Sequence, residues 1–225
     1  MFTHTKEIKT IHVYGPGGPY KAMKECAEAF TKQQNIRVDI VKGTPDEWIG
    51  RARQDADLVY GGAEYMLEDY NRDYPGLIEM STAEPLYVRQ IGIIVRKGNP
   101  KQIELLEGLT QKHIRILNVE LEKMEEYQDK LPGIRENIYC SVVTGEEGIA
   151  MWQSATGLDA WITYRTWHMQ LSETTDFIPL TGRSAYRAAP IAFTAQPKMR
   201  DDASLFIRFL KSEEARLIFK NWGWE

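Results

Sequence analysis

The chain has few of the segments that would assign it to a membrane or nucleic-acid-binding class. Its longest apolar runs, such as Ile91–Val95, are far shorter than the roughly 20 residues that a membrane-spanning helix needs. Lys and Arg number 28 against 32 Asp and Glu, so the net charge of −4 gives no general attraction for nucleic acid or anionic lipid. We therefore expect no membrane insertion and no nucleic-acid partner.

Histidine and cysteine, which carry much of enzyme and metal chemistry, are scarce. The four histidines are scattered, without the close spacing of metal ligands: His4, His12, His113 and His168. Neither Cys26 nor Cys140 has a base nearby in the sequence, and no nucleophile elbow or P-loop is present. We expect two free, buried thiols, no metal, no cofactor and no enzymatic activity.

The first ten residues, MFTHTKEIKT, contain no apolar core and no small-residue cleavage site, so no signal peptide is recognised here. Two interpretations stay open. The protein is periplasmic or otherwise extracytoplasmic if a leader was removed, and cytoplasmic if Met1 is its natural start.

Strands and helices alternate through the first third of the sequence. Extended runs at Ile11–Tyr14, Val38–Val41 and Asp57–Tyr60 are separated by segments with helical spacing of apolar residues. This rhythm predicts an α/β fold with mixed, mostly parallel sheets covered by helices. Farther on, a charged stretch from about Glu120 to Lys130 is expected to be a solvated helix face. A last helix would present an apolar stripe made by Phe206, Phe209, Leu210 and Leu217.

Two long extended runs, Leu86–Val95 and Pro190–Thr194, bracket the middle third of the chain. A chain that leaves one α/β lobe and later returns to it needs two such crossings. We predict a first lobe of residues 1–88 plus 192–225 and a second of 89–191. The hinge crossings would lie near 87–95 and 189–194, with the binding site in the cleft between the lobes.

Glycine-rich turns follow the first three strands and lead into helices. They are Tyr14-Gly15-Pro16-Gly17-Gly18-Pro19, Lys42-Gly43-Thr44-Pro45 and Tyr60-Gly61-Gly62-Ala63, and Val143-Thr144-Gly145 repeats the pattern later. Glycine lets a backbone approach a ligand closely, and the first N–H groups of a helix have no internal partner. Such helix starts bind anions. Ordinary turn chemistry is the better explanation of any one of these loops, whereas four of them at strand-to-helix junctions favour a site about as much as plain turns.

Charged residues near these turns are the next candidates. Arg89, Arg165 and Arg187 could each pair with a carboxylate or an oxyanion. Glu64 and Glu146 stand beside helix starts, where a carboxylate ordinarily caps the helix. If either pointed into an anion site, it would repel the ligand unless that ligand also carried an amine or a metal.

Several segments resemble class II periplasmic solute-binding proteins, and in particular the AcfC-like branch related to sulfate- and molybdate-binding proteins. The likeness is carried by IHVYGPGGPYKAMKECAEAFTKQQNIRVDI, DADLVYGGAEYM, EPLYVRQIGIIVRKGNP, VVTGEEGIAMW, DAWITYRTW and ASLFIRFLKSEEARLIFKNWGWE. The resemblance implies a two-lobed Venus-flytrap fold, a small anionic ligand, a monomer, and delivery to an ABC importer or a chemoreceptor. With the residues nominated above, the expected ligand-binding set is Gly17, Gly18, Pro19, Thr44, Gly61, Gly62, Ala63, Glu64, Arg89, Thr144, Gly145, Tyr164 and Arg165.

The preferred function is therefore capture of a sulfate-like oxyanion or a small organic acid. Two alternatives remain. A bilobed transferase-type enzyme would need an acid–base pair, for which Glu64 or Glu146 with His168 is the available combination. A cytoplasmic sensor domain would fit a natural start at Met1.

Overall fold

The computed structural model describes residues 8–225, and the part of the predicted first lobe at residues 1–7 lies outside the described residues. The chain forms two compact units. Of the described residues, unit 1 comprises 8–88, 188–221 and 225, and unit 2 comprises 89–187 and 222–224. The hinge role of the two crossing segments stays a prediction.

Unit 1 contains a four-stranded sheet in the order β2-β1-β3-β9. The strands β1 (Thr10–Gly15), β2 (Arg37–Lys42) and β3 (Leu58–Tyr60) are parallel, and β9 (Tyr186–Phe193) runs antiparallel to β3. Because the first three strands are parallel, their carboxyl ends meet at one edge of the sheet. The three glycine-rich turns of this unit lie at that edge.

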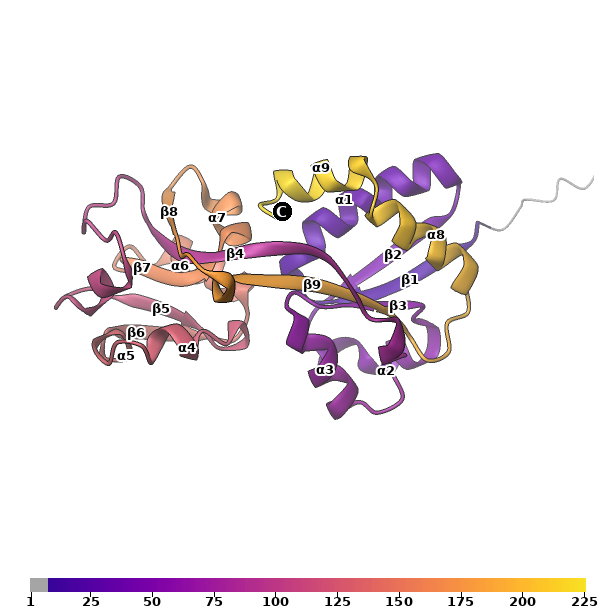
Figure 1. Ribbon diagram of the computed structural model, residues 1–225, viewed down its shortest axis with the longest axis horizontal. Helices are drawn as coiled ribbons and strands as arrows, with labels where there is room; N and C mark the ends of the chain where they lie inside the picture. Colours follow the sequence, from indigo (N-terminus) through magenta and orange to yellow (C-terminus); the bar gives the residue numbers. More distant parts are fainter. Residues whose placement is uncertain (1–7) are drawn as a thin grey trace, which may run out of the picture. The chain divides into compact units, whose positions relative to one another are not determined.

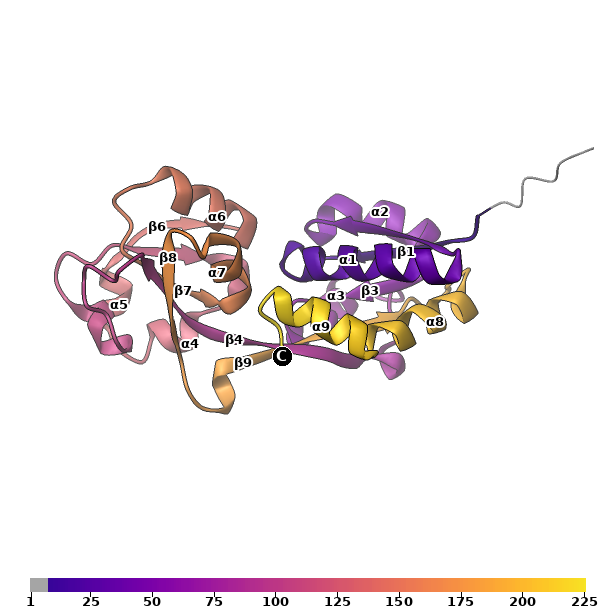
Figure 2. The same cartoon turned by 90° about the horizontal axis from the view of Figure 1, so that it is seen from above.

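Helices cover both faces of the sheet of unit 1 (Figure 1). One face carries α1 (Gly17–Gln34), α8 (Arg200–Leu210) and α9 (Glu213–Asn221), and Figure 2 shows α1 and α9 side by side. Phe30 of α1 contacts Phe206 with ring centroids 5.2 Å apart. The other face carries α2 (Pro45–Asp55) and α3 (Glu64–Asp73), whose Trp48 and Tyr70 join a buried cluster. The expected terminal helix is thus two helices, and Leu217 is 49% exposed and not part of an apolar stripe.

Unit 2 contains a mixed sheet in the order β4-β7-β5-β6, with β8 pairing the other edge of β4. The strands are β4 (Glu84–Arg96), β5 (Ile116–Val119), β6 (Ile138–Val142), β7 (Ala160–Tyr164) and β8 (Thr175–Pro179). β5 is parallel to both β6 and β7, whereas β4 is antiparallel to β7 and β8. The predicted mixed α/β class is confirmed, although the strands β6 and β8 were not predicted from the sequence.

The helices of unit 2 are α4 (Glu125–Gln128), α5 (Gly133–Glu136), α6 (Gly145–Ser154) and α7 (Arg165–Leu171). Within residues 8–225, short 3₁₀ turns occur at Met80–Thr82, Leu106–Thr110, Glu120–Glu122 and Arg183–Ala185. The expectation of a solvated helix from Glu120 to Lys130 is wrong. This stretch is a 3₁₀ turn followed by α4, and it buries Glu122, Tyr127 and Gln128.

Cys26 and Cys140 are both free thiols. Cys26 is buried as expected, whereas Cys140 is only half-buried because it lies on the edge strand β6. Burial raises the pKa of both thiols, Cys26 more strongly, so neither is poised as a nucleophile. Among residues 8–225, no helix is long and apolar enough to cross a bilayer.

Candidate anion-binding site

The start of α1 is the most open helix start in unit 1. The helix begins at Gly17 directly after β1, its N-cap residue Pro16 makes no side-chain hydrogen bond, and its first turn contains no acidic residue. Every other described helix of nine or more residues carries Asp or Glu in its first turn: α2, α3, α6, α8 and α9. The backbone donors of Gly17 and Gly18 therefore retain the uncompensated positive end of an 18-residue helix. Pro19, in the same turn, is buried and has no N–H to offer.

The predicted second loop is occupied by its own carboxylate. Glu47 accepts hydrogen bonds from the backbone N–H of Thr44 at 2.6 Å and from the Thr44 hydroxyl at 3.0 Å. The backbone bond, followed by the hydroxyl bond, lowers the pKa of Glu47. Thr44 is thus the capped start of α2, and an anion would have to displace Glu47 to reach these donors.

In the third loop of unit 1, the backbone N–H groups also have acceptors within the protein. The N–H of Gly61 donates to the carbonyl of Pro190 at 2.8 Å, and that of Gly62 points to the sulfur of Met66 at 3.1 Å. A Cβ on Gly61 would meet the Ala63 carbonyl at 3.0 Å, so close packing accounts for this glycine. Glu64 accepts a hydrogen bond from the backbone N–H of Ala188 at 2.9 Å. Its carboxylate therefore holds the start of the returning strand.

Lys42 is a residue of unit 1 that the sequence analysis did not nominate. It ends β2, at the edge of the sheet where α1 begins, and its ammonium lies 5.1 Å from the ring centroid of Tyr20 in the first turns of α1. This places a cation near the open helix start. The position after a parallel strand, which directed attention to the glycines, would also have selected this lysine.

In unit 2, the start of α6 is capped in the same manner as α2. Glu147 accepts from the backbone N–H groups of Val143 at 2.8 Å and Thr144 at 3.2 Å, and the Thr144 hydroxyl accepts from the N–H of Glu147. Gly145 faces the indole of Trp167, which a Cβ would approach to 2.3 Å. Here glycine is required by an aromatic ring of the protein itself.

Arg89 is the most distinctive charged residue of unit 2. It is only 3% exposed, and its guanidinium carbon lies 3.4 Å from the ring centroid of Tyr164 and 5.2 Å from that of Trp224. Its Nε has no hydrogen-bond acceptor among residues 8–225. A buried cation is costly unless an anion offsets its charge, and a buried donor is costly when it is left unused. The carboxyl group of Glu122 is near enough to interact with the charge of Arg89, but the Nε donor stays unused, so Arg89 is a candidate for ligand contact.

Arg165 contacts other residues than Arg89 does. Its Nη2 donates to the side-chain oxygen of Gln90, and its guanidinium lies 5.1 Å from the Phe177 ring centroid. These partners differ from those of Arg89, so the described contacts do not join the two arginines in one cluster. Arg187, the third candidate, contacts Glu126 at 3.6 Å.

Glu122 is the buried carboxylate that the sequence analysis missed. It accepts hydrogen bonds from the Thr163 hydroxyl at 2.6 Å and from the Trp167 indole at 2.5 Å. Burial raises its pKa to about 7, against the opposing effects of Thr163, the positive charge of Arg89 and Trp167. Because Glu122 closely follows β5, it lies at the same sheet edge as Tyr164 and Gly145. Extending the strand-end argument to β5 would have found it.

The surroundings of His168 give little support to the acid–base pair that an enzyme would need. Its Nδ1 lies 2.9 Å from the Thr175 hydroxyl, and its ring stacks on Phe177. Burial, followed by the charges of Lys97 and Arg165, lowers its pKa. Glu146 is exposed at the start of α6.

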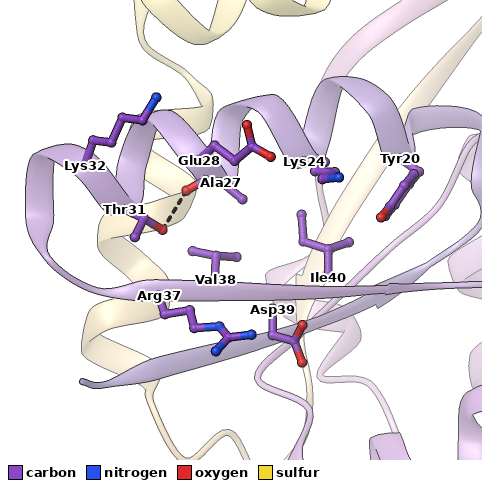
Figure 3. Close-up of a pocket in the computed structure, with 10 residues that line it drawn as sticks. All are labelled: Tyr20, Lys24, Ala27, Glu28, Thr31, Lys32, Arg37, Val38, Asp39 and Ile40. Carbon is purple, nitrogen blue, oxygen red and sulfur yellow. Dashed lines mark hydrogen bonds between the residues drawn. The ribbon is translucent and has the colours of Figure 1, made fainter. Parts of the chain in front are cut away.

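A groove of about 500 Å³ lies between α1 and the edge strand β2 (Figure 3). Cationic Lys24, Lys32 and Arg37 alternate there with Glu28 and Asp39, so the lining has no dominant charge. None of the predicted ligand-binding residues lines it.

Comparison with known proteins identifies the family to which this chain belongs. The model of the bacterial extracellular solute-binding protein family matches residues 11–225. The chain belongs to this family. Its members typically bind small anions and deliver them to ABC permeases, and membership implies an extracytoplasmic location. A comparison with curated protein sequences gives no match.

Solved structures agree with the family. PEB3 with bound L-phospholactate is 26% identical, with a TM-score of 0.82 over 96% of this chain and 99% of that chain. Another PEB3 structure, of the protein from Campylobacter jejuni, is 27% identical, with a TM-score of 0.78 over 96% of this chain and 99% of that chain. The sulfate-binding protein SubI of Mycobacterium tuberculosis is 16% identical, with a TM-score of 0.76 over 96% and 86% of the two chains.

A third similar structure is the periplasmic molybdate-binding protein of Azotobacter vinelandii. It is 13% identical, with a TM-score of 0.68 over 96% of this chain and 98% of that chain. The expected likeness to class II periplasmic binding proteins, including the AcfC-like branch, is confirmed. The family and these neighbours are binding proteins and not enzymes, in agreement with the sequence analysis.

Proposed function

We propose that this protein captures a sulfate-like oxyanion or a small organic acid, without chemical change, for an ABC importer or a chemoreceptor. It acts as a monomer in the periplasm or an equivalent extracytoplasmic space. Within unit 1, the proposed ligand contacts are the amide donors of Gly17 and Gly18. Within unit 2, the proposed contact is the guanidinium of Arg89.

The open start of α1 is the observation that carries the proposal. A helix dipole places about half a positive charge at its N-terminus, and proteins usually offset it with an acid. This chain does so in its other long helices and not in α1. An anion at Gly17 and Gly18 would supply the missing negative charge and accept hydrogen bonds from the unused N–H groups.

The names of the similar structures support the same ligand class. PEB3 was solved with phospholactate, and the two other neighbours are sulfate- and molybdate-binding proteins. Sulfate and molybdate are oxyanions, whereas phospholactate carries both a phosphate and a carboxylate. The proposal therefore covers oxyanions and small phosphorylated or carboxylated acids.

Titration calorimetry on protein that has been unfolded, dialysed and refolded tests the proposal. The panel is sulfate, molybdate, phosphate, L-phospholactate and a set of di- and tricarboxylates. We expect one group of anions to bind, and Arg89→Gln to weaken that binding by roughly 10- to 100-fold, since a hydrogen bond to a charged group contributes about 1.5–3 kcal/mol. Arg183→Gln, on the 3₁₀ turn at Arg183–Ala185, is the matched control. Absence of binding across the panel, with a folded protein, would refute the proposal.

A further inference from the structure

The last four residues of the chain do not simply end helix α9. Asn221 and Glu225 belong to unit 1, whereas Trp222–Trp224 belong to unit 2. The chain thus passes between the units at residues 221/222 and 224/225, in addition to 88/89 and 187/188. The extended runs in the sequence predict only two crossings, with residues 192–225 wholly in the first lobe.

This C-terminal segment, Trp222–Glu225, is held by backbone hydrogen bonds beside the start of the first crossing. The N–H of Val88 donates to the carbonyl of Glu225 at 2.9 Å, and the N–H of Glu225 donates to the carbonyl of Val88 at 2.8 Å. The neighbouring residues Arg89 and Trp224 form an antiparallel bridge. The pairing fixes Trp224 next to Arg89 by backbone geometry.

The C-terminal segment contacts Arg89 through an aromatic ring. Trp224 is 1% exposed, and the guanidinium of Arg89 lies over its ring as well as over Tyr164. No acceptor within residues 8–225 binds the Nε of Arg89, so the faces of the two aromatic rings take part in orienting the guanidinium. Removing one ring should leave the guanidinium with several orientations of similar energy.

Gly223 shows that the segment also passes tightly over the first turn of α7. Its φ of +85° is a conformation that glycine adopts without strain. A Cβ there would lie 2.8 Å from the Met169 side chain and 3.4 Å from the backbone carbonyl of Arg165. The glycine lets the segment approach α7 closely enough to set Trp224 beside Arg89.

We propose that Trp224 is a positioning residue of the anion-binding site, which orients Arg89 for the ligand. This inference rests on the proposed function and adds a residue to it. Trp224 needs no contact with the anion, since it acts through the guanidinium that it stacks against.

The first test is the affinity of Trp224→Ala and Trp224→Phe for sulfate, measured by calorimetry beside the wild type. We expect the Ala variant to bind roughly 3- to 30-fold more weakly, in proportion to the contribution of a partly desolvated cation–π contact, and the Phe variant to recover most of the loss. Trp222→Ala removes a tryptophan from the same segment and should bind as the wild type does. Equal affinities of Trp224→Ala and the wild type would overturn the inference.

A second test needs no ligand and separates this inference from the proposed function. The Arg89 Nε–H signal in a ¹H–¹⁵N spectrum, assigned by its loss in Arg89→Lys, should be shielded by the rings and protected from exchange. Trp224→Ala should shift it downfield and speed its exchange, whereas Trp222→Ala should not. An Arg89 signal unmoved by Trp224→Ala overturns the inference even if sulfate binds. A wild type that binds no anion, with the Arg89 signal behaving as expected, refutes only the proposed function.

Discussion

The hydroxyl of Thr163 donates a hydrogen bond to the carboxylate of Glu122 at 2.6 Å, inside unit 2. Thr163 is on β7 and Glu122 closes the turn after β5, so the bond joins two adjacent parallel strands beyond the end of one of them. Trp167 adds an indole donor from α7. These hydrogen bonds hold the carboxyl group in the core near Arg89. Its protonation state therefore affects the free energy of unfolding of the unit.

The stability of the protein should decrease as pH rises through this carboxylate's titration. Glu122 has an ordinary pKa of 4.5 and a folded-state pKa of about 7. Between these values the folded state holds a proton that the unfolded state has lost, so the stabilisation is complete below pH 4.5 and gone above pH 7. Relative to the wild type, Glu122→Gln should gain roughly 3 kcal/mol between pH 4.5 and pH 8. Urea denaturation at a series of pH values measures the difference, with the exposed Glu120→Gln as the control.

An acid introduced into the first turn of α1 should act as an internal competitor. Gly18→Asp supplies the negative charge that this helix lacks, so it should stabilise the ligand-free protein by about 0.3–1 kcal/mol and weaken anion binding at least tenfold. Thermal unfolding and calorimetry with sulfate provide the two readouts. Gly18→Asn keeps the size of the side chain without its charge and should weaken binding less. Unchanged affinity in Gly18→Asp would place the ligand elsewhere.

Two glycine-to-alanine changes should have opposite effects on stability. Gly145→Ala forces a Cβ to 2.3 Å from the Trp167 ring, and it should destabilise the protein by about 1–3 kcal/mol. Gly50 lies inside α2 with nothing within 4 Å of an added Cβ. Gly50→Ala should therefore stabilise by about 0.5–1 kcal/mol. Chemical denaturation compares them, and a harmless Gly145→Ala would show that Trp167 can move away freely.

Glu64 should prove to be a structural residue. Its carboxylate accepts the Ala188 N–H, so Glu64→Ala should cost about 1 kcal/mol of stability, whereas Glu64→Gln keeps an acceptor and should cost less. Neither change should alter anion affinity by more than about twofold, a difference of roughly 0.4 kcal/mol. Glu68→Ala, exposed on the same helix, is the control. A large gain or loss of affinity in Glu64→Gln would return this residue to the ligand site.

The sequence predicted the α/β class and the strand-to-helix turns because these depend on local patterns. Gly17 and Gly18 do begin a helix, and Thr144 does cap one. What the pattern could not show is which amide groups stay unused. Thr44 and Thr144 are each followed three residues later by a glutamate that closes a capping box, and a Glu at that position is itself a readable signal.

The missed features depend on contacts between distant segments. Glu122 is surrounded by exposed charged neighbours in sequence, and only pairing with Thr163 and Trp167 accounts for its burial. Trp224 is one of several aromatic residues near the end, and its place beside Arg89 follows from a β-bridge across more than half of the chain. Local periodicity does not encode such pairings.

The uncompensated dipole of α1 has a practical consequence for handling the protein. Any buffer that contains sulfate, phosphate or citrate offers a counter-ion to Gly17 and Gly18, so material purified in such buffers should arrive with its site already filled. Melting temperatures recorded in those salts would then describe a complex, and calorimetric titrations would report exchange of one anion for another. Samples stripped under denaturing conditions and refolded in a weakly coordinating, monovalent electrolyte are the proper starting point for measuring intrinsic affinity.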